Sequence, residues 1–124
     1  MRIKDSGKER INMTITEFNT MTIDERQCIT ELDLCDNDLT DISVLAGLKG
    51  LKTLDLGYNN LTDISALAEL KGLECLYLRD NKLTDVSALA GLTRLKRLFL
   101  WNTNLTDDAI ATLKNALPNT IIFS

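Results

Sequence analysis

The chain has 124 residues, of which 44% are hydrophobic but only 5% aromatic, and its formal net charge is −4. This length predicts one domain, and because no run of 18 or more residues is apolar we expect no segment that crosses a membrane. The negative charge disfavours nucleic acids and anionic membranes as partners. The chain lacks histidine, and its three cysteines (Cys28, Cys35 and Cys75) form no CxxC pair, which predicts no zinc or other metal site, no cofactor and no disulfide framework.

The first ten residues, MRIKDSGKER, are charged and contain no apolar stretch like that of a secretory signal. Free thiols fit a reducing compartment. We therefore expect a cytoplasmic protein, or a secreted or surface-attached one if a signal or an anchor has been removed.

Residues 1–28 are expected to form an N-terminal tail and cap. Apolar and polar residues alternate over 11–16, which favours a strand. Thr22 precedes Glu25 by three residues, the spacing of a capping box, which predicts a helical turn. We expect the Cys28 side chain to pack inward.

Residues 29–117 contain four copies of one pattern, each beginning 22 residues after the last, at Leu32, Leu54, Leu76 and Leu98. The copies read LDLCDNDLTDISVLAGLKGL, LDLGYNNLTDISALAELKGL, LYLRDNKLTDVSALAGLTRL and LFLWNTNLTDDAIATLKNAL. The two leucines that open each copy are two residues apart, so in a strand both point to the same side. Stacked copies bury these leucines jointly, which predicts a parallel sheet in a repeat solenoid.

Two polar columns are expected to support each turn of the chain. The first contains Asn37, Asn59, Asn81 and, in the fourth copy, Thr103. An amide offers donors and an acceptor to backbone groups that the sheet leaves unpaired, whereas threonine replaces it only in part. The second column is the Thr-Asp pair at 40–41, 62–63, 84–85 and 106–107, where either side chain could cap the start of a short helical return.

The C-terminal end departs from the repeat. Residues 108–117 favour a longer helix with Ile110, Leu113 and Leu117 on one face, and Pro118 ends it. Residues 118–124 are expected to form a C-terminal cap that includes a short strand.

The LxLxxNxL pattern, the 22-residue period and the TDIxxLxxLxxL segment resemble the leucine-rich repeats of bacterial internalins. The resemblance implies an α/β fold: a right-handed solenoid shaped as a short horseshoe, with a parallel concave sheet, short helical returns on the convex side and caps at both ends. It also implies a bacterial source and protein ligands.

The sequence disfavours an enzyme and a calcium-binding protein. Without histidine, a Ser–His or Cys–His pair cannot form, and Asp33 and Asp55 are more simply explained as acids on a solvated sheet face than as a catalytic pair, so we expect no enzyme. The aspartate column could be imagined to bind Ca²⁺, but one carboxylate per coil does not supply six converging oxygens, and capping is the better explanation.

The outward sheet positions differ between copies, which is where a repeat protein carries specificity. They change from acidic in the first two copies to aromatic and basic in the last two. The candidate partner-binding residues are Tyr77, Phe99, Trp101, Arg79, Arg97, Tyr58, Asp33 and Asp55. Aromatic residues and arginine dominate binding hot spots. We expect a non-enzymatic module that binds a partner protein on the concave face. In the alternative, the aromatic side chains pack against Ile121 and Phe123, or the chain dimerises through this aromatic C-terminal end.

Overall fold

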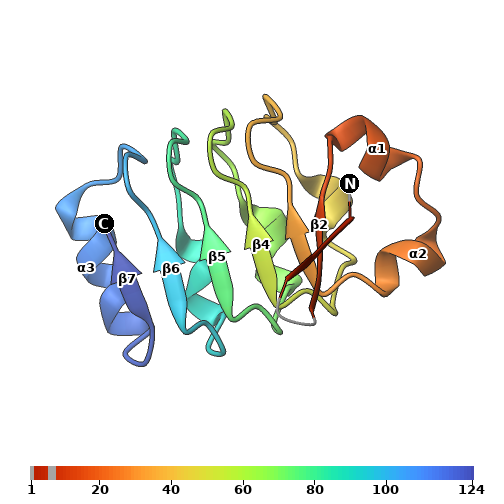
Figure 1. The fold of residues 1–124 in the computed structure, drawn as a ribbon. Coiled ribbons are helices and arrows are strands. Elements are labelled where there is room, and N and C mark those ends of the chain that lie inside the picture. Colours follow the sequence, from red (N-terminus) through yellow and green to blue (C-terminus); the bar gives the residue numbers. More distant parts are fainter. Residues whose placement is uncertain (1, 6–7) are drawn as a thin grey trace.

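The computed structural model describes residues 2–5 and 8–124 and shows one curved sheet with helical segments behind it (Figure 1). The strands lie side by side in chain order: β1 Arg2–Asp5, β2 Lys8–Asn12, β3 Glu31–Asp33, β4 Thr53–Asp55, β5 Cys75–Tyr77, β6 Arg97–Phe99 and β7 Ile121–Phe123. The β1–β2 pair is antiparallel, and every following pair is parallel. The predicted leucine-rich-repeat solenoid is confirmed.

The returns between the central strands are 3-10 helices: η1 Ser43–Leu45, η2 Ser65–Glu69 and η3 Ser87–Gly91. Only the last return is an α-helix, α3 Asp107–Ala116. Two short helices, α1 Ile15–Asn19 and α2 Ile23–Gln27, precede β3. No helix among the described residues is long and apolar enough to cross a membrane.

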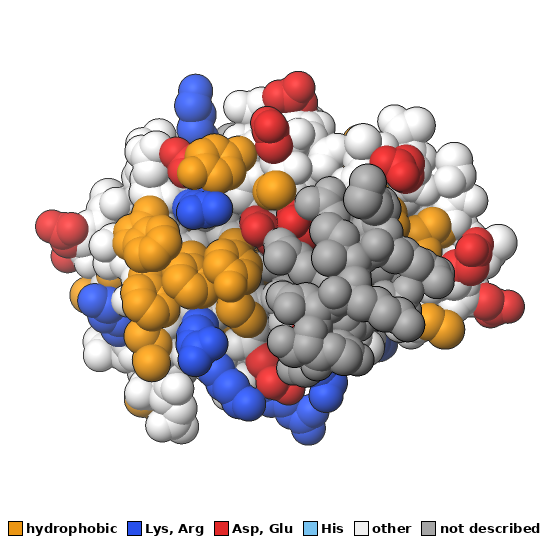
Figure 2. All heavy atoms as spheres, viewed as in Figure 1, with side chains coloured by type: hydrophobic (Ala, Val, Ile, Leu, Met, Phe, Trp, Pro, Cys, Tyr) orange, Lys and Arg blue, Asp and Glu red, His pale blue; other side chains and the backbone are white. Residues whose placement is uncertain are grey.

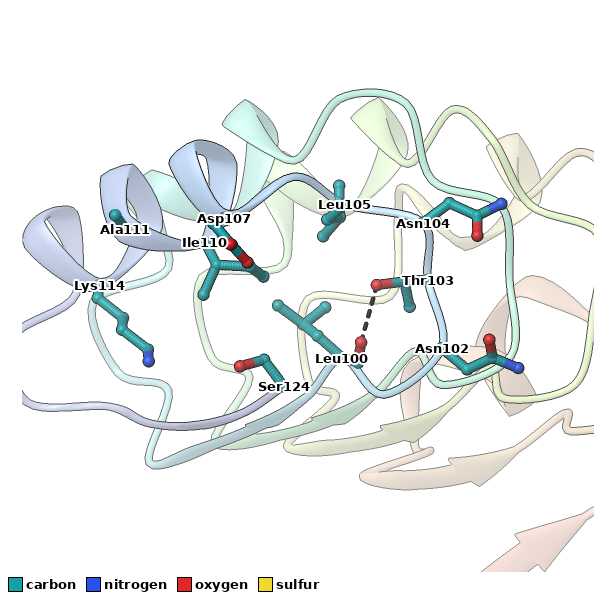
Figure 3. Close-up of a pocket in the computed structure, with 10 residues that line it drawn as sticks. All are labelled: Leu100, Asn102, Thr103, Asn104, Leu105, Asp107, Ile110, Ala111, Lys114 and Ser124. Carbon is teal, nitrogen blue, oxygen red and sulfur yellow. Dashed lines mark hydrogen bonds between the residues drawn. The ribbon is translucent and has the colours of Figure 1, made fainter.

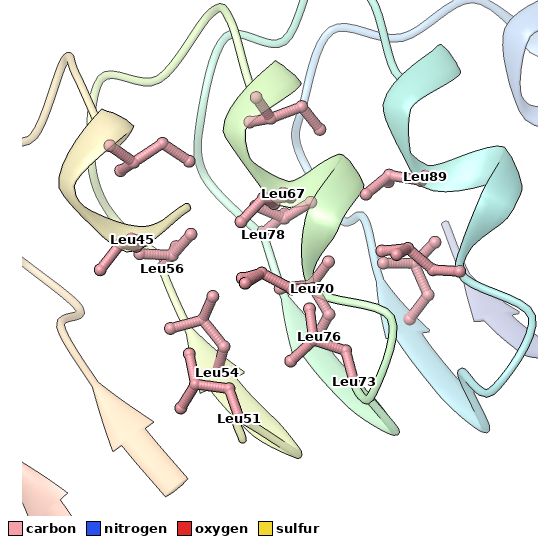
Figure 4. Packing of buried hydrophobic residues seen from close by; sticks show 14 of the residues in the cluster. Leu45, Leu51, Leu54, Leu56, Leu67, Leu70, Leu73, Leu76, Leu78 and Leu89 are labelled. Atoms are coloured by element: carbon pink, nitrogen blue, oxygen red, sulfur yellow. The ribbon is translucent and has the colours of Figure 1, made fainter. Parts of the chain in front are cut away.

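Leucines fill the space between the sheet and the returns. Leu54 pairs in register with Leu32 on one side and Leu76 on the other, and all three are at most 1% exposed. Figure 4 shows leucines of the strand segments and of the returns pointing toward one another. Burying one leucine contributes about 1.5–3 kcal/mol, so stacked coils stabilise one another through this shared core.

The asparagine column holds the turns that follow the strands. The Asn59 Oδ1 atom accepts hydrogen bonds from the backbone N–H groups of Asn37 and Leu39, both at 2.9 Å. Its Nδ2 atom donates to the carbonyl oxygens of Leu34 and Leu56 at 3.2 and 2.9 Å, so one amide links two coils.

In the fourth coil Thr103 makes only part of these contacts. Its Oγ1 atom donates to the Leu100 carbonyl oxygen at 2.8 Å. The sequence-based expectation for the column, including this weaker fourth position, agrees with the structure.

The aspartate column satisfies backbone groups at the start of each 3-10 return. Asp63 Oδ1 accepts from the Ser65 N–H at 2.9 Å, and Asp41 and Asp85 make the equivalent bond. This contact lowers the pKa of each of these carboxyl groups. In the last return the threonine takes over, since Thr106 is the N-cap of α3 and its side chain accepts from the Ala109 N–H.

The N-terminal region differs from the prediction of a strand over 11–16. The strand β2 ends at Asn12, and Thr14 then caps α1 in a capping box with Glu17. The Ile15 N–H donates to Asn37 Oδ1 at 3.0 Å, so the start of α1 joins the asparagine column. The capping box at Thr14 therefore determines a helix where the alternating pattern predicted a strand.

The second capping box is confirmed, because Thr22 and Glu25 cap α2 reciprocally. The expected packing of Cys28 is wrong, since its side chain is exposed. Cys28 is the C-cap of α2, a helix without buried residues, and the next residue, Ile29, takes the inward position at 3% exposure.

Candidate partner-binding face

Three aromatic rings from neighbouring strands stack on the concave face of the sheet. Tyr77, Phe99 and Phe123 pair in register along β5, β6 and β7. The ring centroids of Tyr77 and Phe99 are 4.4 Å apart with planes 2° from parallel, and those of Phe99 and Phe123 are 4.6 Å apart at 4°. The Trp101 ring lies against Phe99 and Phe123 at 5.4 and 5.7 Å, tilted by 58°. We call these four residues the aromatic platform.

The sequence names both Ile121 and Phe123 as possible packing neighbours of the aromatic side chains, and a count of 22 residues from Phe99 leads to Ile121. The actual pairing is Phe99 with Phe123, and Ile121 lies beside Arg97 instead. The return before β7 is a ten-residue α-helix rather than a 3-10 turn of five residues or fewer. The length of this helix in the sequence was the signal that the register would shift by two.

Packing against the C-terminal strand does not enclose the platform. Trp101 keeps 43% of its surface exposed, and Tyr77, Phe99 and Phe123 are half-buried. Figure 2 shows hydrophobic side chains gathered over β5–β7, with Lys and Arg side chains on both sides of them along the strand direction. Stacking and exposure therefore occur together.

Arg79, from the segment after β5, is the base on one side of the platform. Its guanidinium carbon lies 4.9 Å from the centre of the Tyr58 ring, a cation–π contact, and its Nε atom is enclosed without a hydrogen-bond partner. A Cβ atom on Gly57 would lie 3.1 Å from Asp55 Oδ1 and 3.2 Å from Arg79 Cγ, so the missing side chain at this position makes room for both. Arg97, on β6, is the exposed base on the other side.

Tyr58 has a left-handed backbone conformation at a position where the other repeats carry aspartate or asparagine. Its φ is 55°, in the left-handed region, and the equivalent residues are Asp36, Asp80 and Asn102 at 56–57°. Aspartate and asparagine tolerate this region, whereas a bulky aromatic residue there is strained. Tyr58 is nevertheless 48% exposed, so burial does not offset the strain.

The acidic end of the face is less open than predicted. Asp33 is only 4% exposed, which corrects the expectation that its carboxylate is solvated, and Asp55 is half-buried. Both carboxylates turn back to the chain: Asp33 Oδ1 accepts from the Cys35 N–H at 3.0 Å, and Asp55 Oδ1 accepts from the Gly57 N–H at 2.9 Å. Asp33 is therefore a poor candidate for direct partner contact.

Asp33, Cys35 and Asp55 bring one ligand atom each within 4.8 Å of one another. Burial, and after it the nearby carboxylates of Asp33 and Asp55, raise the pKa of the Cys35 thiol to about 12. Two carboxylates and one thiol fall short of the donor sets that Zn²⁺ or Ca²⁺ require. The cluster does not fit a metal centre.

A hollow of about 470 Å³ at the C-terminal end was not predicted (Figure 3). It lies between α3 and the segment that follows β6, and Leu100, Leu105 and Ile110 supply its apolar part. Asp107 and Lys114 line it from α3.

Comparisons with known proteins agree with the fold. A family described as leucine rich repeat matches residues 28–83, and one described as leucine rich repeats in two copies matches residues 71–115. No relative was found among curated protein sequences.

Among solved structures, internalin C2 of Listeria monocytogenes is 36% identical with a TM-score of 0.71, and the match covers 77% of this chain and 41% of that one. An internalin (inlF) of the same organism is 33% identical with a TM-score of 0.72, covering 77% and 28%. A leucine-rich repeat protein of Leptospira interrogans is 27% identical with a TM-score of 0.73, covering 85% and 28%.

The chain thus spans less than half the length of each of these proteins. Leucine-rich repeats are typically non-enzymatic interaction scaffolds, and the two bacterial genera fit the predicted bacterial character of the repeat. The two family matches, which together extend from residue 28 to residue 115, and the structural likeness show that the chain belongs to the leucine-rich repeat proteins, with repeats like those of internalins.

Proposed function

We propose that this chain binds a partner protein on the concave face of its sheet, with the aromatic platform as the anchor. The observation that carries the proposal is that four aromatic side chains converge on β5–β7 and remain partly exposed, with Trp101 at 43%. Large aromatic side chains contribute much contact area for little loss of conformational entropy. Arg79, Arg97 and Tyr58 border the platform, and Asp55 contributes the acidic side of the face.

The size of the face limits the affinity. Five strands, β3–β7, spaced about 4.8 Å apart give a width of roughly 20–24 Å, and eight extended residues give a length of roughly 25 Å. The resulting area of roughly 500–600 Å² is smaller than the ~800 Å² that each partner contributes to a standard interface. We therefore expect weak binding, or contacts that also include the sheet edges.

The test compares protein capture by the wild-type chain and by the double variant Phe99→Ala/Trp101→Ala. A matched control removes two exposed apolar side chains outside the face, Ile23 and Val44, by substitution to alanine. Thermal unfolding checks that both variants fold. We expect a captured protein that the control retains and the platform variant loses. Equal capture by a folded platform variant would remove the anchor from the proposal.

Self-association is the second candidate function. Ile121 is 58% exposed on β7, the last strand of the sheet, where it pairs with Arg97 and lies two residues before Phe123. An exposed edge strand offers unpaired backbone groups to another chain. Sedimentation over a range of concentrations distinguishes the two functions, because a monomer at every concentration excludes self-pairing.

A further inference from the structure

We propose that the partner segment bound by the aromatic platform is acidic: an extended peptide in which a carboxylate stands on each side of an aromatic or large aliphatic residue. This inference rests on the proposed function and specifies the chemistry of its ligand.

The bases on the two sides of the platform are available for an incoming acid. Within the part of the chain that the structure describes, neither Arg79 nor Arg97 makes an ion pair. Lys52 and Lys96, by contrast, share Glu74, with Nζ–O distances of 4.0 and 3.2 Å. The two lysines at the rim of the sheet thus form ion pairs with an acid of the same chain, whereas the two arginines that flank the platform remain open to an acid from a partner.

The positions of the arginines define a spacing. Arg97 pairs in register with Cys75, and Arg79 follows Cys75 by four residues. Four extended residues span about 13 Å, so the two guanidinium groups rise from opposite ends of the platform. An extended peptide with acids at positions i and i+4 spans the same length and places residue i+2 over the rings.

Arginine is suited to this task because its planar guanidinium binds a carboxylate through two parallel hydrogen bonds. Arg79 is also held in place, since its stem passes over Gly57 and its guanidinium rests on the Tyr58 ring at 4.9 Å. A positioned donor loses little side-chain entropy on binding. The strained Tyr58 backbone is then explained by its contact with this arginine.

The acidic residues at the β3–β4 end of the face favour one direction for the bound peptide. A peptide that crossed the sheet toward β4 would bring its acids close to Asp55, which pairs in register with Tyr77. A peptide that runs along β5 and β6 keeps its acids at the two arginines. The net charge of −4 disfavours a long polyanion such as nucleic acid for the same reason.

The test uses a library of random twelve-residue peptides displayed on phage, selected on the immobilised full chain. We expect enrichment of the pattern acid–x–aromatic–x–acid. A synthetic peptide with this pattern is then titrated against the wild-type chain and the variants Arg79→Gln and Arg97→Gln. Each variant is expected to weaken binding by about tenfold, close to 1.4 kcal/mol, and so is replacing either peptide glutamate with glutamine.

The matched control is Lys49→Gln, which removes one exposed positive charge from the return side of the molecule. Its peptide affinity should equal that of the wild-type chain, whereas a loss similar to that of the arginine variants would indicate a general effect of net charge and overturn the proposal. Gly57→Ala keeps every charge but crowds the Arg79 stem and the Asp55 carboxylate beside it, so it should weaken binding as Arg79→Gln does.

The outcomes separate this inference from the function on which it rests. Selected peptides that require Phe99 and Trp101 but carry no acids, or that bind equally well to both arginine variants, overturn the acidic partner and leave the binding face intact. Peptides that bind the Phe99→Ala/Trp101→Ala variant as well as the wild type, or a selection that enriches no sequence, overturn both.

Discussion

The two ends of the sheet face share one backbone and differ in chemistry. At the β3–β4 end, Asp33 and Asp55 direct their carboxylates to backbone N–H groups of their own coils. At the β5–β7 end, the same strand position carries Tyr77, Phe99 and Phe123, whose rings stack across the strands. The acids satisfy the chain itself, whereas the rings leave apolar surface open to a partner.

This difference shows that the shared frame of the solenoid, its leucine core and asparagine column, does not depend on which side chains point outward from the sheet. Buried leucines and the asparagine column recur in coils of both ends. The outward side chains can therefore change from acidic to aromatic without altering the register of the strands. Substitutions at each end, and in the columns that both ends share, test this separation.

The largest effect is expected where the shared frame is broken. Replacing Asn59 with alanine leaves the N–H groups of Asn37 and Leu39 without their acceptor. Each buried unsatisfied group costs about 1–3 kcal/mol, so the free energy of unfolding should fall by about 2–6 kcal/mol. Thr103→Ala, which removes one hydrogen bond, should cost about 1 kcal/mol.

The same variant asks whether the two ends unfold together. Trp101 is the only tryptophan, so its fluorescence reports the aromatic end, whereas circular dichroism reports the whole chain. In a solenoid each coil is stabilised by its neighbours, so both signals of Asn59→Ala should share one lowered urea midpoint. An unchanged fluorescence midpoint beside a lowered dichroism midpoint would show that the ends are separate units.

The next effect is specific to the acidic end. Burial and the neighbouring carboxylates raise the pKa of Cys35 to about 12, and the thiolate is the reactive form. At pH 8 iodoacetamide should alkylate Cys35 at least roughly a hundredfold more slowly than an unstructured peptide thiol, whose pKa is about 8.5. Asp55→Asn removes a negative charge near the thiol and should increase the rate.

Mass spectrometry of tryptic fragments measures this reactivity, and the exposed Cys28 serves as the internal reference. If Cys35 reacts as fast as Cys28, the acidic end is more open than the structure shows.

At the aromatic end, Phe99→Ala removes the central ring of the stack. Each aromatic pair contributes about 0.5–1.5 kcal/mol beyond the area that it buries, and Phe99 stacks on two rings. We expect a loss of at least about 1–3 kcal/mol in urea unfolding, because the apolar area of the ring is lost as well. Phe99→Leu keeps most of the apolar area but removes the stacking, so it should lose less than Phe99→Ala; a leucine variant as stable as the wild type would mean that stacking contributes nothing.

Between the two ends, Tyr58→Asn relieves the left-handed backbone at φ 55° but removes the contact with Arg79. Relief is worth about 1 kcal/mol, and an exposed cation–π contact about 0.5–1 kcal/mol. The variant should therefore be as stable as the wild type or slightly more stable, while peptide binding weakens. A clear loss of stability would show that Tyr58 serves folding rather than binding.

These features differ in how far the sequence predicts them. The 22-residue period predicts the leucine and asparagine columns because both depend on contacts that repeat in every coil. The repeat period does not predict the stack of Phe99 on Phe123, because the coil that contains α3 is two residues longer than the coils with 3-10 returns. The burial of Asp33 and the conformation of Tyr58 depend on what lies beside one particular coil, which a repeat pattern does not encode.

The smallest effect concerns a column that both ends share. Hydrogen bonds from the backbone N–H groups of Ser43, Ser65 and Ser87, and after them the serine side chains, lower the pKa values of Asp41, Asp63 and Asp85. A carboxyl group whose folded pKa is below its unfolded value of about 3.9 stabilises the fold above that pH, and this contribution is lost as the pH falls through the folded pKa.

Asp63→Asn keeps an oxygen that can accept from the Ser65 N–H but removes the charge. The wild-type chain should therefore be slightly more stable than this variant at pH 7, and the difference should disappear at about pH 2, below both pKa values. Urea unfolding across this range measures the difference, and a carbon-detected NMR titration locates the three carboxyl pKa values. Because the column repeats identically in the coils of β3, β4 and β5, all three should titrate below the unfolded value, whatever the chemistry of the sheet face in front of them. A difference in stability that stays constant with pH would mean that the aspartate acts only through its shape, and the charge of this column would then be irrelevant to both ends of the solenoid.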